Sequence, residues 1–245
     1  MKVGMIGIGL MGHGIAGNIV KQGHELAMLE HPGNQPLDAL KAAGAVSLRS
    51  ATELAARSDV VILVLTGSPQ VETVLTGPDG VLEGLRPGSV VIDCSTAIPS
   101  STLRMAQAVQ AAGSRFLDAP MTRTPKEAAA GRLNLLVGGE TALLQECRPL
   151  LECFAENIVH AGPVAAGHGM KLLHNYVSLG MVSLLCEAAA CAGEQKRFWE
   201  MHDRLFASQD RLEPWGAHAE ALSLDGPAFD ECLASGRHAT GIRRG

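Results

Sequence analysis

Residues 2–12 read KVGMIGIGLMG, and this stretch decides the fold of the N-terminal part of the chain. Its opening KVGMI run predicts a buried strand, and a helical pattern covers 10–22. Between them the glycines have the spacing G-x-G-x-x-G. In this spacing Gly7 permits a tight turn, Gly9 lets a pyrophosphate approach the backbone, and Gly12 lets the helix pack against the strand. Strand, turn and helix together predict a dinucleotide-binding βαβ unit, with phosphate at the helix N-terminus.

The residues after this turn bear on which dinucleotide binds. Glu25–Leu29 predicts the second strand, and Glu30 follows 18 residues after Gly12. An acidic side chain here accepts hydrogen bonds from the ribose hydroxyls and repels a 2′-phosphate, which favours NAD over NADP. His31 keeps NADP possible, because an imidazolium would tolerate the phosphate. The alternative is a glycine-rich turn in an α/β domain that binds no nucleotide.

Apolar runs alternate with helical patterns over the first 160 residues. Runs without polar alternation are typical of strands buried on both faces, so the fold class is α/β, a Rossmann-type, doubly wound and mostly parallel sheet. We expect an NAD(P)-binding domain over 1–162, an interdomain long helix within 163–192, and an atypical short all-helical region over 193–245. Further strands are expected at 59–65, 89–93, 115–118 and 132–137, with helices at 98–111 and 141–151.

The sequence pattern changes in the C-terminal third of the chain. A Gly/Ala loop at 162–169 precedes a long apolar helix at about 170–192, whose most apolar part, 172–186, is too short to span a bilayer. Phe198, Met201 and Leu205 recur at helical spacing and predict a buried stripe. The helices expected after the long one are 194–207, 214–222 and 227–235.

Composition and cysteine usage exclude several classes of protein. With 47% hydrophobic and 18% charged residues the chain is globular, and its net charge of −5 gives no basic field for nucleic acid or an anionic membrane. The six cysteines contain no C-x-x-C pair and fit neither zinc nor a disulfide framework, so no metal is expected. Cys191 and Cys232 are expected to be buried or incidental thiols. Unpaired thiols and the lack of a signal peptide favour a cytoplasmic location.

Four blocks resemble the β-hydroxyacid dehydrogenases, the family of 3-hydroxyisobutyrate dehydrogenase and tartronate semialdehyde reductase. The blocks are GIGLMG at 7–12, DCSTAIP at 93–99, DAP at 118–120 with LLVGG at 135–139, and GPVAAGHGMKLLHN at 162–175. The resemblance covers about residues 1–192. It implies an NAD(P)-dependent oxidoreductase that transfers a hydride between the nicotinamide and a small 3-hydroxy acid or its semialdehyde. It also implies a homo-oligomer formed through the 170–192 helix.

The resemblance assigns roles residue by residue. Lys171 would be the general acid/base, and Asn175, one turn later on the same helix face, would hold the substrate. Each of these assignments has a purely structural alternative. The alternatives are a solvated lysine for Lys171, a packed asparagine for Asn175, a helix cap for Ser95 and Thr96, and a surface arginine for Arg123. The substrate-binding residues would be Ser95, Thr96, Thr122 and Arg123. The cofactor-binding residues would be Gly7, Gly9, Leu10, Met11, Gly12, Glu30, His31, Leu65, Thr66 and Thr96.

Three departures from the family pattern qualify these expectations. Met121-Thr122-Arg123-Thr124 replaces the usual Val-Ser-Gly-Gly, and Arg123 would pair with a carboxylate of a larger or doubly charged acid. Ala165 replaces a usual glycine. From about 187 the chain resembles the helical part of DsbA-like thioredoxin-fold proteins instead of the family's C-terminal helical domain. One alternative function is therefore a dinucleotide-binding but catalytically impaired chimera; a thiol–disulfide activity is disfavoured because C-x-x-C is absent.

Overall fold

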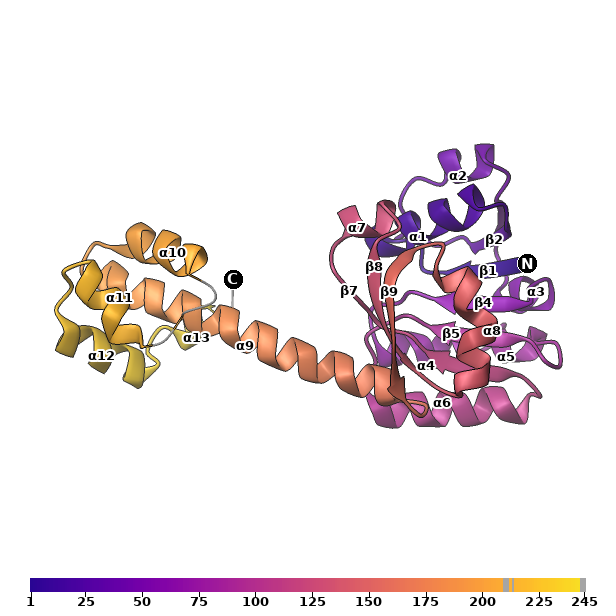
Figure 1. The fold of residues 1–245 in the computed structure, drawn as a ribbon. Helices are drawn as coiled ribbons and strands as arrows, with labels where there is room; N and C mark the ends of the chain where they lie inside the picture. Colours follow the sequence, from indigo (N-terminus) through magenta and orange to yellow (C-terminus); the bar gives the residue numbers. More distant parts are fainter. Residues whose placement is uncertain (209–211, 213, 243–245) are drawn as a thin grey trace. The chain divides into compact units, whose positions relative to one another are not determined.

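The protein is described by a computed structural model over residues 1–208, 212 and 214–242 (Figure 1). It divides into a unit of Met1–Leu173 and a unit of His174–Gly245. The strands are β1 (Lys2–Ile6), β2 (Glu25–Leu29), β3 (Val46–Leu48), β4 (Val60–Leu63), β5 (Val90–Asp93), β6 (Arg115–Asp118), β7 (Met121–Thr122), β8 (Leu133–Gly138) and β9 (Ala155–Gly162). The helices are α1 (Leu10–Lys21), α2 (Asp38–Ala42), α3 (Ala51–Ala56), α4 (Ser68–Thr76), α5 (Val81–Gly84), α6 (Pro99–Ala111), α7 (Pro125–Ala129), α8 (Thr141–Leu151), α9 (Ala166–Glu194), α10 (Phe198–Ala207), α11 (Trp215–Ala221), α12 (Gly226–Ser235) and α13 (Ala239–Ile242).

The first unit is a mostly parallel sheet flanked by helices, which confirms the predicted fold class. The strand order is β3-β2-β1-β4-β5-β6-β8-β7, and β9 pairs with β8. Parallel pairs join β3 through β6, whereas β8 runs antiparallel to β6 and β7. The chain winds outward from β1 in both directions, so β1 and β4 flank the switch point. In such sheets ligands bind in the crevice at the carboxyl ends of these strands.

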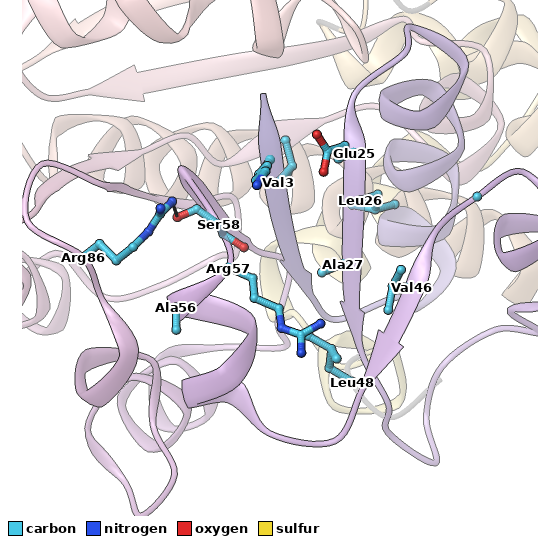
Figure 2. Close-up of a pocket in the computed structure, with 12 residues that line it drawn as sticks. Val3, Glu25, Leu26, Ala27, Val46, Leu48, Ala56, Arg57, Ser58 and Arg86 are labelled. Atoms are coloured by element: carbon cyan, nitrogen blue, oxygen red, sulfur yellow. Dashed lines mark hydrogen bonds between the residues drawn. The ribbon is translucent and has the colours of Figure 1, made fainter.

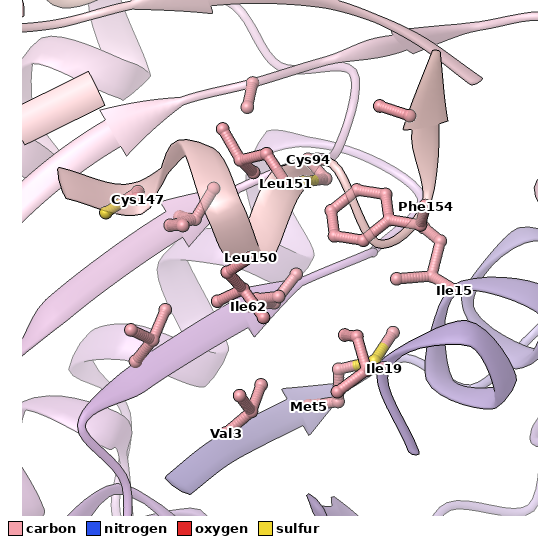
Figure 3. Packing of buried hydrophobic residues seen from close by; sticks show 14 of the residues in the cluster. Val3, Met5, Ile15, Ile19, Ile62, Cys94, Cys147, Leu150, Leu151 and Phe154 are labelled. Carbon is pink, nitrogen blue, oxygen red and sulfur yellow. The ribbon is translucent and has the colours of Figure 1, made fainter. Parts of the chain in front are cut away.

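Each face of this sheet is covered by its own apolar cluster, because successive strand residues point to opposite faces. Val60 and Ile62 of β4 lie in one cluster, and Val61 and Leu63 lie in the other. Figure 3 shows the first cluster, in which side chains of α1 and α8 pack on strand residues around Ile62. The second cluster is closed by α3, α4 and α6. Burial on both faces explains why these strands lack polar alternation.

Several elements of the first unit differ from the sequence expectation. The strands β3 and β7 are too short for a periodic pattern to show, and β9, AENIVHAG, carries polar residues because much of it is exposed. The long helix begins at Ala166 instead of about 170, so half of the expected Gly/Ala loop is helical. The helix α9 extends on both sides of the apolar stretch 172–186, so by length and composition alone it is long enough to cross a membrane; 33% of its most apolar part is buried.

The second unit packs short helices around the C-terminal part of α9. Residues of α9 through α12 share a buried cluster with Met201 and Leu205 at its centre. Two positions of the predicted stripe are therefore buried, whereas Phe198 is 37% exposed and stacks edge-on with Trp199 at a centroid distance of 5.0 Å. The helix α10 also begins later than expected, at Phe198.

Cys191 and Cys232 form a disulfide between α9 and α12, with a Cα–Cα distance of 5.8 Å. Both residues are buried as expected, but the expectation that they are thiols was wrong. The two residues are 41 positions apart and belong to no local motif, so only the packing of α12 against α9 brings them together. The other four cysteines, Cys94, Cys147, Cys153 and Cys186, are free.

Candidate functional site

The three motif glycines have three different environments. Gly7 has a φ of +97°, and a Cβ built on it would lie 2.1 Å from the Val64 carbonyl oxygen. A Cβ on Gly12 would lie 1.9 Å from the Gly7 oxygen, because α1 starts close to β1. A Cβ on Gly9 would meet no atom within 4 Å. The turn is therefore closed around Gly7 and Gly12 and open at Gly9, where an approaching phosphate needs room.

A cavity of about 550 Å³ opens beside this turn, at the carboxyl ends of β1, β2 and β4. Gly7, Gly9, His31, Leu65 and Thr66, all expected to contact the cofactor, line it. Leu10 is largely exposed and Met11 half-buried at the start of α1. The cavity size, the open glycine and the free N–H groups of a helix start fit a dinucleotide.

Asn34 links two segments that line this cavity. The sequence did not predict a role for it. Its side-chain oxygen accepts a hydrogen bond from the Ile8 amide at 3.3 Å, and its amide group donates to the Leu29 carbonyl at 2.9 Å. Asn34 thus ties the glycine turn to the end of β2. The sequence feature that could have identified this residue is an asparagine shortly after the second strand.

A second cavity, of about 540 Å³, lies at the other end of the sheet. Figure 2 shows it beside Val3 and Glu25, which stand at the amino ends of β1 and β2, with Arg57 and Arg86 on its other side. Ligands of doubly wound sheets bind at the carboxyl ends of the strands. We therefore place the candidate site at the opposite end, beside the glycine turn.

Glu30 directly follows β2 and lies between two cations. Its carboxylate lies 3.2 Å from Arg49 Nε and 3.5 Å from Lys41 Nζ, and the Arg49 hydrogen bond lowers the pKa of Glu30. His31 accepts a hydrogen bond at Nδ1 from the Gly33 amide at 3.0 Å. Lys41 and Arg49 are therefore the nearby positive charges that a 2′-phosphate would meet.

Glu30→Gln is expected to shift cofactor preference toward NADPH. The substitution removes the negative charge and releases Arg49 and Lys41, which then meet a 2′-phosphate. We expect NADPH to bind about 10-fold more tightly, or about 1.4 kcal/mol, and NADH to bind more weakly. Fluorescence titration of both cofactors measures this, with Glu25→Gln, at the far end of β2, as the control. An unchanged ratio of the two dissociation constants would show that Glu30 does not discriminate between a ribose 2′-hydroxyl and a 2′-phosphate.

Ser95 follows β5 and is buried. Its hydroxyl oxygen accepts a hydrogen bond from the Leu65 amide at 2.9 Å, which joins the β5 loop to the cofactor cavity. The same hydroxyl also hydrogen-bonds the Asp93 carboxylate. Thr96 beside it is exposed. The structure therefore brings Ser95 to the rim of the cavity at Leu65, and the roles of both residues toward ligand stay predictions.

His168 joins the Ser95 loop to α9 and was missed in the sequence. Its Nε2 donates to the Ser95 carbonyl oxygen at 3.1 Å, because a carbonyl can only accept, and its Nδ1 lies 2.7 Å from Thr102 Oγ1. Asp93 and Asp118, the last residues of β5 and β6, each place a carboxylate oxygen 3.9 Å from this ring. The sequence feature that could have identified this network is the carboxylate residue at the end of each of two neighbouring apolar strands.

Asp118 fixes where α9 begins. Its carboxylate accepts from the Ala165 amide at 2.7 Å and from the His168 amide at 2.8 Å, so it satisfies N–H groups at the helix start. Asp93 accepts from the Ser95 amide at 2.9 Å, and burial raises its pKa. A Cβ on Gly138 or Gly167 would strike the Asp118 carboxylate, which explains the glycines of these blocks.

Lys171 lies one turn into α9, three residues after His168. Its side chain is half-buried, and burial lowers the pKa of its ammonium. A lysine with a lowered pKa is a better general base near neutral pH. Asn175 follows four residues later in α9. The catalytic roles of both residues remain predictions.

Thr122 and Arg123 lie at β7 and just after it. Thr122 Oγ1 accepts from the Asn134 side chain at 3.2 Å, and the Arg123 guanidinium pairs with Glu156 and with the Arg132 carbonyl. Arg123 thus already has a carboxylate partner within the protein. It also has a φ of +80°, at a position where the resembled family has glycine.

Ala165→Gly is expected to stabilise the first unit. Ala165, the other place where a usual glycine is replaced, has a φ of +75°, a region that costs an L-residue free energy. We expect the free energy of unfolding to rise by about 1 kcal/mol, measured by urea denaturation. Ala166→Gly, in the first turn of α9, should instead lower it by about 0.5–1 kcal/mol. Equal effects of the two variants would contradict the strain at Ala165.

Comparison with known proteins agrees with this geometry. Residues 2–162 match the family model described as the NAD binding domain of 6-phosphogluconate dehydrogenase. The chain is 37% identical over 189 residues to the NAD-dependent L-serine dehydrogenase of Pseudomonas aeruginosa, covering 77% of this chain and 63% of that protein. It is 34% identical over 191 residues to the 2-(hydroxymethyl)glutarate dehydrogenase of Eubacterium barkeri, covering 77% and 62%. The chain therefore spans less than two thirds of the length of these two relatives.

Solved structures show the same fold at lower identity. The 3-hydroxyisobutyrate dehydrogenase of Mycobacterium tuberculosis, solved with L-serine, has a TM-score of 0.72 and 24% identity, covering 95% of this chain and 91% of that one. An imine reductase variant of Myxococcus stipitatus, solved with NAD+, has a TM-score of 0.69 and 18% identity, covering 99% and 92%. These likenesses concern the fold alone.

Proposed function

Because this chain belongs to the β-hydroxyacid dehydrogenase family, with an NAD binding domain over residues 2–162, we propose that it is an NAD(P)-dependent oxidoreductase. Its reaction is hydride transfer between the nicotinamide and a small 3-hydroxy acid or its semialdehyde. NAD is the proposed cofactor, because the acidic Glu30 directly follows β2, where its carboxylate accepts from ribose hydroxyls and repels a 2′-phosphate. When bound, the cofactor supplies the hydride acceptor for oxidation and the hydride donor for reduction.

One chain of hydrogen bonds carries this proposal. The Leu65 amide, on the cofactor cavity, donates to Ser95 Oγ, and the Ser95 carbonyl accepts from His168 Nε2, one turn of α9 before Lys171. The cofactor cavity and the candidate base are thus held by one network within the first unit. A hydroxyl proton must leave as its carbon loses hydride, so a base fixed beside the cofactor is what the reaction requires.

In the proposed reaction each residue of the site has its own role. Lys171 Nζ takes the hydroxyl proton during oxidation and returns it during reduction. Ser95 hydrogen-bonds the substrate, and Asn175 orients the substrate hydroxyl or carboxylate. Thr96 and Thr122 line the substrate, and the Arg123 guanidinium, shared with Glu156, is a further cation for the substrate carboxylate. The network around His168 and Asp118 fixes the start of α9 and hence the place of Lys171.

Self-association is a further part of the proposal. Tyr176, Val177, Leu179 and Val182 of α9 are each at least half exposed within the described residues. Apolar area of this extent favours burial, and we propose a second copy of the chain as the partner on the 170–192 segment. A cytoplasmic location is also proposed; the four free cysteines support it, whereas the Cys191–Cys232 disulfide weighs against it.

The test starts from cofactor binding and proceeds to turnover. Thermal unfolding with and without NADH and NADPH should show a higher midpoint with NADH, because a ligand of the folded state stabilises it. Absorbance at 340 nm then follows oxidation of 3-hydroxyisobutyrate and L-serine and reduction of small semialdehydes. Turnover of any of these supports the proposal. Binding without turnover of any would favour a dinucleotide-binding protein that is catalytically impaired, and no binding of either cofactor would overturn both.

A further inference from the structure

The end of α9 carries a cluster of metal-binding side chains that the proposed oxidoreductase reaction does not use. Glu187, Cys191 and Glu194 lie on one face of α9, and Cys232 of α12 and His238 approach that face. A ring nitrogen of His238 and the two sulfur atoms all lie within 4.8 Å of one another. We propose that Cys191, Cys232 and His238 form a redox-gated site for Zn²⁺, closed while the disulfide is intact.

The ligand types and their spacing suit Zn²⁺. Thiolate and imidazole are its preferred ligands, with tetrahedral geometry and Zn–S bonds of about 2.3 Å. That geometry separates two coordinated sulfurs by about 3.8 Å, so breaking the S–S bond and a small rotation of each side chain suffice. Three protein ligands leave the fourth position to water. Cys191 and Cys232 are almost fully buried, whereas the His238 side chain is 32% exposed and marks the side of entry.

Two glutamates hold His238 close to the disulfide. The His238 amide donates to Glu187 Oε1 at 2.9 Å, which fixes the backbone, and Glu187 is itself buried. Glu194 Oε1 lies 2.8 Å from His238 Nε2, and the Arg237 guanidinium also donates to the Glu194 carboxylate. A carboxylate bound to Nε2 would leave Nδ1 to coordinate the ion, the usual arrangement behind a zinc-bound histidine.

The switch is a balanced thiol–disulfide reaction. A dithiol gives two electrons and two protons, its sulfurs become a disulfide, and the Cys191–Cys232 bond becomes two thiols. Binding of Zn²⁺ then releases both thiol protons to solvent as the two thiolates coordinate the ion. In the oxidised form no thiolate is available. The disulfide and the metal are therefore alternative cross-links between α9 and α12.

Metal titration of the full-length chain in both redox states tests the proposal. After reduction with dithiothreitol and anaerobic desalting, we expect one Zn²⁺ per chain in competition with a chromophoric chelator, and none in the oxidised chain. Co²⁺ in place of Zn²⁺ should give the thiolate charge-transfer absorption and the intense visible bands of a tetrahedral site. Zinc should also raise the unfolding midpoint of the reduced chain alone.

Variants separate this site from the free cysteines. Cys232→Ser should abolish the Co²⁺ thiolate bands, and Glu194→Gln should weaken Zn²⁺ binding about 10-fold or more. Cys186→Ser, at an exposed free cysteine, should bind as the parent does. If Cys232→Ser unfolds, Glu194→Gln and the Co²⁺ spectrum of the reduced parent decide. Failure of the reduced parent to bind, or equal binding by the oxidised chain, would overturn the site, and neither result depends on the oxidoreductase activity.

Discussion

Gly9→Ala is expected to weaken NADH binding about 100-fold while leaving the fold in place. A Cβ at Gly9 meets no protein atom within 4 Å, and its φ of −78° and ψ of −158° are open to alanine. The added methyl group instead occupies the space in which a pyrophosphate approaches the backbone. The loss corresponds to about 2.7 kcal/mol of binding free energy. The unfolding free energy of the unliganded chain should fall by less than about 1 kcal/mol, the cost of alanine as an N-cap.

Two other glycines of α1 provide matched controls for this experiment. A Cβ on Gly17 also meets nothing within 4 Å, so Gly17→Ala should stabilise α1 by about 0.5–1 kcal/mol and leave NADH affinity unchanged. Gly12→Ala places a carbon 1.9 Å from the Gly7 oxygen and should destabilise the unit whether or not cofactor is present. Calorimetric titration with NADH measures the affinities. Normal NADH binding by Gly9→Ala would place the phosphate elsewhere.

The sequence predicted those parts of the fold whose causes are local. The runs KVGMI and VVIL are short segments in which burial on both faces leaves no polar alternation, and the structure has a strand at each. Residues 7, 9 and 12 could be given separate roles because each role depends on backbone geometry. The two replaced glycines, at Arg123 and Ala165, both have positive φ, so these departures from the family pattern carry a physical cost.

The parts that the sequence did not predict depend on distant contacts. Asp118 reaches 47 positions along the chain to bind the Ala165 amide, which is why α9 starts earlier than its apolar pattern suggests. The Cys191–Cys232 bond has no spacing signature. Arg123 looks like a free cation in the sequence, yet Glu156 of β9 engages it, and β9 itself was not expected. Such pairings follow from the sheet order, which periodicity alone cannot supply.

Lys171→Met should abolish most turnover and retain cofactor binding. General acid/base groups contribute about 10²–10⁴-fold to a rate, so we expect kcat for hydroxy-acid oxidation to fall by about that factor. NADH affinity should change little, because Lys171 belongs to α9 and does not line the cofactor cavity. Methionine keeps the length and apolar stem of lysine and loses only the amine. Lys126→Met, at an exposed lysine of α7, is the control and should keep full activity.

The pH dependence distinguishes a base from a merely structural lysine. Burial lowers the pKa of Lys171 from its ordinary 10.5, so the amine becomes neutral at a pH below that value. Oxidation needs the neutral amine, and its rate should rise with pH up to the lowered pKa; reduction needs the ammonium and should fall over the same range. The same shift makes the parent gain stability as pH rises from the lowered pKa to 10.5, because the unfolded chain binds the extra proton. Lys171→Met should lose both dependences. If its residual rate kept the parent's rise with pH, or its kcat fell less than 10-fold, the proton would be moved by another group.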